Sequence, residues 1–249
     1  MAKNQSIVRL SGSIDGVTYT EGVNGKLSRS RSSLNKAKMD ANPKYHRLRL
    51  LQQELAGYSR YGALLRSGVK SELARIKPFR GVQRLNKLLN EIKNEDALHP
   101  MGGRTVAEGL KSVRGTNLLT NFDFYGKKKV TDLLEQSFVV DVSTGEARIE
   151  GFTPTLDLIS PETATHVLFK SAFVGLDFEQ NLVSTKRSPE VYLPIDDVRS
   201  DLILQSDGIP ETTVSLFYVV QVIFYDEING SRIINSMDDA VFTIIEIKA

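Results

Sequence analysis

Few residues in this 249-residue chain have the types and spacing that a catalytic or metal site needs. The chain has no cysteine, which excludes thiolate nucleophiles, disulfides and cysteine-type metal sites. Its three histidines, His46, His99 and His166, lie in separate segments without ligand spacing. No Gly-x-Ser-x-Gly elbow is present, although a Ser/His/Asp triad is recognised only by geometry. We therefore expect a protein that is not an enzyme and that uses no metal and no cofactor.

One short motif has the composition of an anion site. Met101-Gly-Gly-Arg-Thr105 places glycines and a basic residue directly before a possible helix N-terminus, where backbone N–H groups can bind an anion. The motif is not a Walker A sequence and lacks the Gly-x-Gly-x-x-Gly spacing. Proline and further glycine lie in the same loop, so a flexible hinge is the favoured interpretation.

The acidic residues of the second half offer a further chemistry. Paired carboxylates can hydrolyse glycosides, and the candidates are Asp132, Asp141, Glu146, Glu150, Asp157 and Glu162. Carbohydrate binding also needs aromatic platforms, and the chain has no tryptophan. A solvated acidic face is therefore the favoured interpretation, and a carbohydrate-binding β-sandwich stays as a third hypothesis.

Charge is distributed very unevenly along the chain. Residues 1–115 hold 22 Lys and Arg against 9 Asp and Glu, a net charge of +13, whereas residues 116–249 hold 10 against 21, a net charge of −11. The basic half could bind phosphates or an acidic protein surface, or it could face the chain's own acidic half. The candidate partner-binding residues are Arg29, Arg31, Lys36, Lys38, Lys44, Arg47, Arg49 and Arg60.

The first of these residues lie in a predicted β arm. Asp15-Gly16 and Asn24-Gly25 favour type I′ turns, which predicts strands over 6–14, 17–22 and 26–32. Alternation along the last strand places Arg29 and Arg31 on one face. So small a meander has too little apolar surface to be stable alone. It must either bind a partner's sheet edge or phosphate, or lie on its own domain.

Residues 42–113 have helical periodicity. Asn42-Pro43 is typical of a helix start, and Leu48, Leu51 and Leu55 then form one apolar stripe that ends near Gly57. A second helix is predicted from about residue 60 to the residue before Pro78, and a third over 81–94. Thr105 and Glu108 form a capping-box pattern that predicts a short fourth helix.

Residues 117–249 have the pattern of short strands separated by turns. The segments 213–225 and 240–248 are rich in β-branched and aromatic residues, and Asn229-Gly230 predicts a hairpin. The expected fold class is α+β: an N-terminal β-hairpin arm (1–38), a small basic helical module (39–115) and an all-β, Ig-like acidic sandwich (116–249).

No segment favours a membrane. The longest apolar stretch, 214–225, has 12 residues, whereas a helix needs about 20 to span a bilayer. The first ten residues lack the long apolar core of a signal peptide. We expect a soluble protein made in the cytoplasm.

The turn and strand motifs also carry a resemblance. They are Gly12-Ser-Ile-Asp-Gly-Val-Thr-Tyr19, Asn24-Gly-Lys26 with Arg29, Asn42-Pro-Lys44, Ala164-Thr-His-Val167, Val174-Gly-Leu-Asp-Phe178, Tyr192-Leu-Pro194 and Phe224-Tyr-Asp-Glu-Ile-Asn-Gly230. With the closing Ile-Ile-Glu-Ile run, the chain resembles an uncharacterised family of Bacteroidota and Bacteroidota-phage proteins. The resemblance covers most of the chain, implies its origin more than a mechanism, and supplies no active-site residues.

These observations together predict a non-enzymatic structural or assembly protein of a tailed-phage particle. The arm and the basic helices would bind neighbouring copies, other virion proteins or packaged DNA, with no small-molecule substrate. The protein would be found in the virion, or in the host cytoplasm before assembly. The alternative is a nucleic-acid-binding accessory protein that contacts phosphates without sequence preference.

Overall fold

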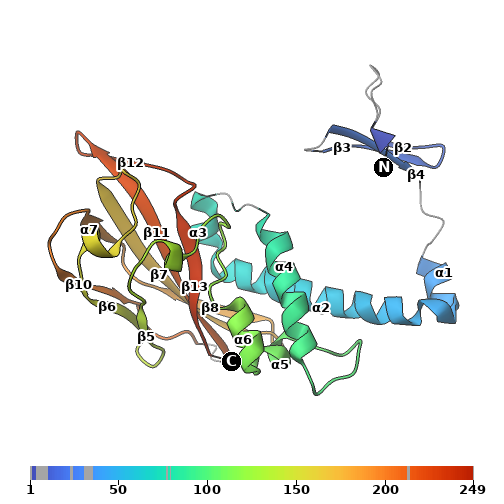
Figure 1. The fold of residues 1–249 in the computed structure, drawn as a ribbon. Helices are drawn as coiled ribbons and strands as arrows, with labels where there is room; N and C mark the ends of the chain where they lie inside the picture. The colour runs from blue at the N-terminus through green and yellow to red at the C-terminus, as the bar shows by residue number, and fades with distance from the viewer. Residues whose placement is uncertain are drawn as a thin grey trace. The chain divides into compact units, whose positions relative to one another are not determined.

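The structure, a computed structural model, describes residues 2–3, 11–22, 25–30, 36–76, 78, 80–211 and 214–248. It confirms the α+β class: an N-terminal hairpin and helices come first, and a β-sandwich-like region follows (Figure 1). The chain divides into two compact units, Met1–Leu50 and Leu51–Ala249. Among the residues listed above, no helix combines the length and apolar character needed to cross a bilayer.

The N-terminal unit contains a small antiparallel sheet with the strand order β1-β4-β3-β2. The strands are β1 (Ala2–Lys3), β2 (Gly12–Ile14), β3 (Val17–Gly22) and β4 (Gly25–Ser30). Asp15 and Gly16 both have positive φ, 46° and 73°, which confirms the type I′ turn. Three parts of the prediction lie outside the described residues: Asn24 of the second turn, the beginning of the strand predicted over 6–14, and the end of the strand predicted over 26–32.

Two short helices follow the sheet and lead into a long one. They are α1 (Lys36–Ala41) and the 3₁₀ helix η1 (Pro43–Tyr45), and the long helix is α2 (His46–Gly68). Asn42 caps η1, as the sequence indicates, because its side chain accepts a hydrogen bond from the Lys44 N–H at 3.1 Å. No described side chain between residues 11 and 50 is buried.

The predicted helix end at Gly57 is wrong, because α2 continues through it to Gly68. A glycine inside a helix costs only about 1 kcal/mol, and Tyr61, Leu64 and Leu65 are buried in the next two turns. By contrast, the side chains of the predicted apolar stripe, Leu48, Leu51 and Leu55, are 37, 40 and 46% exposed.

The remaining helices of the second unit are short. They are α3 (Lys70–Arg75), α4 (Gly81–Ile92), η2 (Lys93–Glu95), α5 (Val106–Leu110), α6 (Val113–Leu119), η3 (Val130–Asp132) and α7 (Pro154–Asp157). The predicted cap of α5 is confirmed, since the Thr105 hydroxyl accepts from the Glu108 N–H at 3.2 Å.

In the described part of the second unit, nine strands form two antiparallel sheets. They are β5 (Val139–Asp141), β6 (Glu146–Phe152), β7 (His166–Asp177), β8 (Leu182–Arg187), β9 (Val191–Pro194), β10 (Ser200–Gln205), β11 (Ser215–Ile228), β12 (Ser231–Ile234) and β13 (Val241–Lys248). The smaller sheet has the order β10-β6-β5. In the larger sheet β11 pairs with β7, β12 and β13, and β7 also pairs with β8 and β9.

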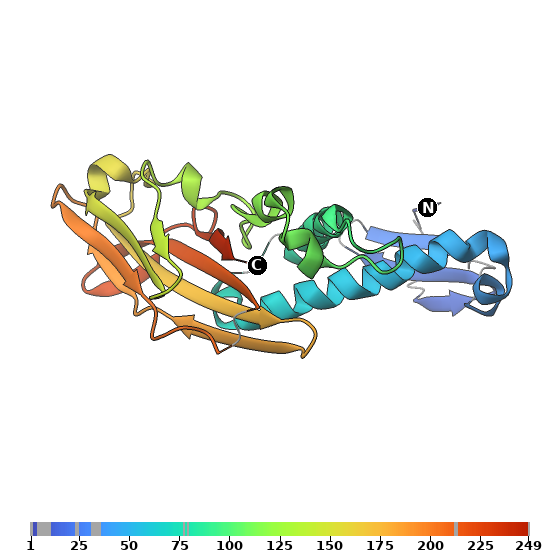
Figure 2. The same ribbon diagram turned by 90° about the horizontal axis from the view of Figure 1, so that it is seen from below.

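The central strands of the larger sheet are buried on both faces, and their side chains alternate between two cores. On β11, Phe217 and Val219 pack with helical residues such as Leu65, Leu85 and Leu89. The intervening Tyr218, Val220 and Val222 pack with Ile149 and Leu204 of the smaller sheet. The helices therefore cover one face of the larger sheet, and the smaller sheet covers the other (Figures 1 and 2).

This packing differs from the predicted division after residue 115. The structure divides after Leu50 instead, and the helices from the second half of α2 to α6 share a core with the sheet. The physical reason is that each short amphipathic helix needs an apolar partner, and the large sheet supplies that surface.

The packing of α5 against the end of α4 can be tested at Gly109. A Cβ atom at Gly109 would lie 2.0 Å from the Ile92 carbonyl oxygen, whereas one at Gly57 would meet nothing within 4 Å. We expect Gly109→Ala to lower the free energy of unfolding by roughly 1–3 kcal/mol. Gly57→Ala should raise it by roughly 0.5–1 kcal/mol. Urea denaturation measures both, and equal effects at the two positions would contradict the described packing.

Candidate functional site

Most of the candidate partner-binding residues lie on the surface of the N-terminal unit. The exposed ones are Arg29 on β4, Lys36 and Lys38 on α1, Lys44 on η1 and Arg47 on α2. Arg31 lies outside the described residues. Within the described part of this unit, no acidic side chain forms an ion pair with Arg29, Lys36 or Arg47. These cations are therefore available to an external anion.

Arg49 and Arg60 have structural contacts instead. The Arg49 guanidinium donates to the carbonyl oxygens of Met39 and Asn42, the latter at 3.3 Å, and so holds the end of α1 against the first turn of α2. Arg60 donates to Asn181 at 3.3 Å, and its guanidinium lies 5.7 Å from the Phe178 ring centroid. Arg49 and Arg60 therefore differ from Arg29, Lys36 and Arg47.

The glycine-rich loop before α5 does bind an anion, but the anion belongs to the chain itself. The buried Glu54 carboxylate accepts hydrogen bonds from the Gly102 N–H at 2.8 Å, the Arg104 Nε at 2.8 Å and the Lys93 Nζ at 2.6 Å. Asp96 fixes the same loop by accepting from the Thr105 N–H at 2.8 Å. The favoured flexible-hinge interpretation is therefore wrong, because buried carboxylates anchor this segment.

Burial alone would raise the pKa of Glu54. The hydrogen bonds from Arg104, Lys93 and Gly102 outweigh that effect and hold the pKa at about 2. Glu54 and Gly102 are 48 residues apart in the sequence, and no sequence pattern indicates that they are in contact.

We expect Glu54→Gln to lower the free energy of unfolding at pH 7 by roughly 3–5 kcal/mol, because Lys93 and Arg104 would lose their anionic partner. The lowered pKa gives the pH dependence: this stabilisation is present above pH 4.5 and is lost as the pH falls towards 2. The stability difference between wild type and variant should therefore shrink in acid. Glu91→Gln on α4 is the control, and urea denaturation from pH 7 to 3 is the measurement. A constant difference would contradict this account.

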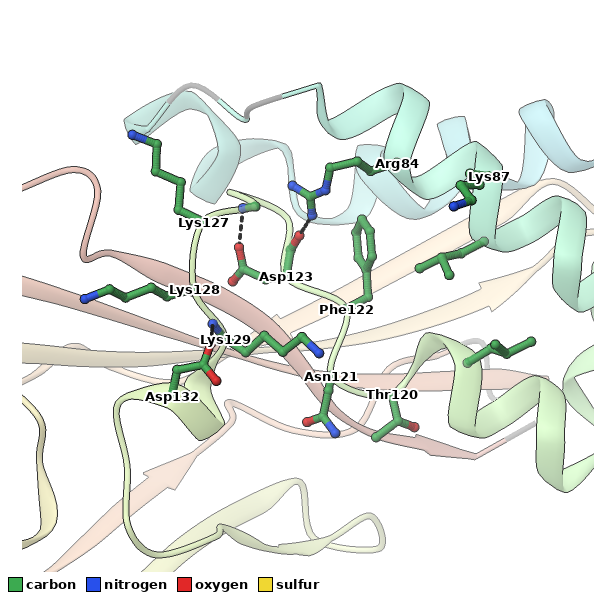
Figure 3. Close-up of a pocket in the computed structure, with 13 residues that line it drawn as sticks. Arg84, Lys87, Thr120, Asn121, Phe122, Asp123, Lys127, Lys128, Lys129 and Asp132 are labelled. Carbon is green, nitrogen blue, oxygen red and sulfur yellow. Dashed lines mark hydrogen bonds between the residues drawn. The ribbon is translucent and has the colours of Figure 1, made fainter.

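The second candidate site is a cavity of about 410 Å³ between α4, α6 and the segment 120–132 (Figure 3). Its lining combines five basic side chains with apolar ones. The lining residues are Arg84, Lys87, Leu88, Leu118, Thr120, Asn121, Phe122, Asp123, Gly126, Lys127, Lys128, Lys129 and Asp132. The residues of this site are far apart in the sequence, where the run of three lysines after Gly126 is a signal for it.

The charges around the cavity are only partly neutralised. Lys127 forms an ion pair with Asp238, and Lys128 forms one with Asp239 at 2.5 Å. Lys87 and Lys129 are exposed, and neither has an acidic partner for its ammonium group among the described residues. Two unpaired cations therefore remain at the cavity.

Asp123 fixes the cavity wall to the large sheet. Its carboxylate accepts from the N–H groups of Gly126 and Phe242, at 2.5 and 2.6 Å, and from the Thr243 hydroxyl at 3.0 Å. Burial nevertheless raises the pKa of Asp123 to about 6. Because these hydrogen bonds fix the Asp123 carboxylate, Asp123 is part of the cavity wall and not a free acid.

Arg84 completes the wall from the helical side. Its guanidinium donates to the Asp123 carbonyl oxygen and lies 5.1 Å from the Phe122 ring centroid. A Cβ atom at Gly126, where φ is +96°, would lie 1.5 Å from the Arg84 Nη1. The positive φ favours glycine at this position, because other residues rarely adopt that conformation.

Of the acidic candidates of the second half, Asp141 and Glu146 line one cavity of about 260 Å³, whereas Asp132 and Asp157 make local contacts. Asp132 caps η3 by accepting from the Lys129 N–H at 2.8 Å, and Asp157 accepts from the Thr153 N–H at 2.7 Å. Asp141 and Glu146 are paired across β5 and β6 on either side of a turn. Within the described ranges, no group of three or more metal-binding side chains lies close enough to hold a metal ion.

Comparisons with known proteins add no assignment. No family model matches the chain, and searches of curated proteins and of solved structures found no match. The resemblance to Bacteroidota and phage proteins therefore remains a prediction from the motifs.

The raised pKa of Asp123 should make the free energy of unfolding depend on pH. Because the folded protein binds this proton more tightly than the unfolded chain, with a pKa of about 6 against 3.8, the stabilisation is full below pH 3.8 and falls as the pH rises through 6. We expect the stability difference between wild type and Asp123→Asn to change by up to about 3 kcal/mol over this range. Urea denaturation at a series of pH values measures it, and carbon NMR of the carboxyl group gives the pKa directly. A pKa near 4 would contradict the described environment.

Proposed function

We propose that this chain is a non-enzymatic assembly protein that joins neighbouring subunits through its N-terminal unit. One observation carries the proposal: no described side chain between residues 11 and 50 is buried, although this unit has regular strands and helices. The second unit, in contrast, has two extensive hydrophobic cores.

The reason is energetic. Ordering a residue costs roughly 1–2 kcal/mol of backbone entropy, and buried apolar surface is the main source of compensation. A sheet without buried side chains lacks that source within its own unit. Binding to another surface would supply it, as in other segments whose folding is coupled to binding.

Charge indicates what kind of surface that would be. Residues 1–50 hold 10 Lys and Arg against 3 Asp and Glu, a net charge of +7, and residues 51–249 hold 22 against 27, a net charge of −5. The basic unit of one copy thus complements the second unit of another. Such head-to-tail contacts form rings or filaments, which suits a particle component.

The motif resemblance supports a more specific form of the proposal. It favours a tailed-phage particle of a Bacteroidota host as the assembly, so the protein would act in the virion and in the host cytoplasm before assembly. The motifs are turn and strand patterns, and they supply no catalytic residue, which agrees with a structural role.

The test measures self-association. Analytical ultracentrifugation of the full chain at tens of micromolar in low salt should show oligomers that dissociate at roughly 0.5 M salt, where charges are screened within a few ångströms. Arg29→Glu, Lys36→Glu and Arg47→Glu together should shift the chain to monomer. Lys70→Glu, Lys111→Glu and Arg114→Glu in the second unit are the matched control and should leave the oligomer intact.

A strictly monomeric wild type, or oligomers that persist in the first triple variant, would overturn the proposal. The same exposed cations support a second candidate, nucleic-acid binding without sequence preference. In that case duplex DNA would bind with an affinity that falls steeply with salt, and the first triple variant would lose it.

A further inference from the structure

We infer that the cavity between α4, α6 and the segment 120–132 binds a small phosphate monoester with an apolar organic group. This inference concerns the second unit alone and is independent of the proposed assembly function. It rests on three features of the cavity: unpaired cations, a fixed wall and an apolar surface.

The cations come from two separate segments. Lys87 lies on α4, and Lys129 lies 42 residues later, just before η3. Neither has an acidic partner among the described residues, whereas the neighbouring Lys127 and Lys128 are neutralised by Asp238 and Asp239. Two ammonium groups that flank one cavity suit a compact dianion, and lysine binds phosphate as a point charge.

The wall of the cavity is fixed by several contacts. Arg84 is held by the Asp123 carbonyl and by the Phe122 ring, and Gly126 leaves the space that its guanidinium occupies. The adjoining Asn121 has a left-handed φ of 66°, and its N–H donates to the Ile244 carbonyl at 2.8 Å. A binding site that is already ordered loses less entropy when the ligand binds.

The apolar part of the lining argues against a bare inorganic anion. Leu88, Leu118 and Phe122 contribute surface beside the cations. The volume, about 410 Å³, lies within the range of roughly 300–1,000 Å³ that is typical of small-molecule sites. A monoester places its phosphate at the lysines and its organic group against this apolar surface.

The test uses isothermal titration of the full chain with phenyl phosphate, inorganic phosphate and benzoate. We expect phenyl phosphate to bind most tightly, because benzoate lacks the second charge and inorganic phosphate lacks the apolar group. The double variant Lys87→Ala/Lys129→Ala should weaken phenyl phosphate binding at least tenfold. Lys127→Ala/Lys128→Ala is the matched control, since these two lysines also line the cavity but are already paired.

Both lysines of the test pair are exposed, so the unfolding midpoint without ligand should stay the same and should show that the variant is folded. Three results would overturn the inference: no binding of phenyl phosphate at millimolar concentration, equal loss of binding in the two double variants, or inorganic phosphate that binds as tightly as the ester. Binding lost only in Lys87→Ala/Lys129→Ala, with the ester preferred, would support it.

Discussion

The antiparallel pairing of β7 and β11 is the constraint on which the second unit depends. Eleven consecutive residue pairs, from Ser215 with Leu176 to Tyr225 with His166, place two long strands at the centre of the larger sheet. Both faces of this pair carry apolar side chains, so each face needs a cover. The helices and the smaller sheet are the two covers, and their positions follow from the alternation of side chains along these strands.

Polar contacts then fix the helical cover to the sheet. Gln221, fully buried on β11, donates to the Tyr125 hydroxyl, which in turn donates to the Glu72 carbonyl at 3.0 Å. The Glu72 carboxylate accepts from Arg187 of β8 at 2.8 Å. Because such groups are costly to leave unpaired when buried, they select one placement of the helices among those that apolar contact alone would allow.

The N-terminal unit presents the opposite physical situation. It has regular secondary structure, a strong positive charge and no buried described side chain. In the second unit, the Glu54 carboxylate of the chain itself binds the glycine-rich loop at Gly102. This contrast is why we propose interactions with other molecules at the basic first unit and at the cavity beside Lys87 and Lys129.

Local pattern was sufficient for much of the fold. The Asp15-Gly16 and Asn229-Gly230 turns, the Thr105 cap and the strands of 213–225 and 240–248 depend on backbone preference and side-chain alternation over a few residues, and all were predictable. Tertiary structure decided the rest: that α2 continues through Gly57, that the helices share a core with the sheet, and that Glu54 fills the loop at Gly102. Tertiary structure also decided the cavity. Lys87 and Lys129 are 42 residues apart and line the same cavity because α4 packs beside the segment that Asp123 connects to β13 by a hydrogen bond. Contacts between distant residues leave no periodic trace in a single sequence, and so they became visible only in the folded chain.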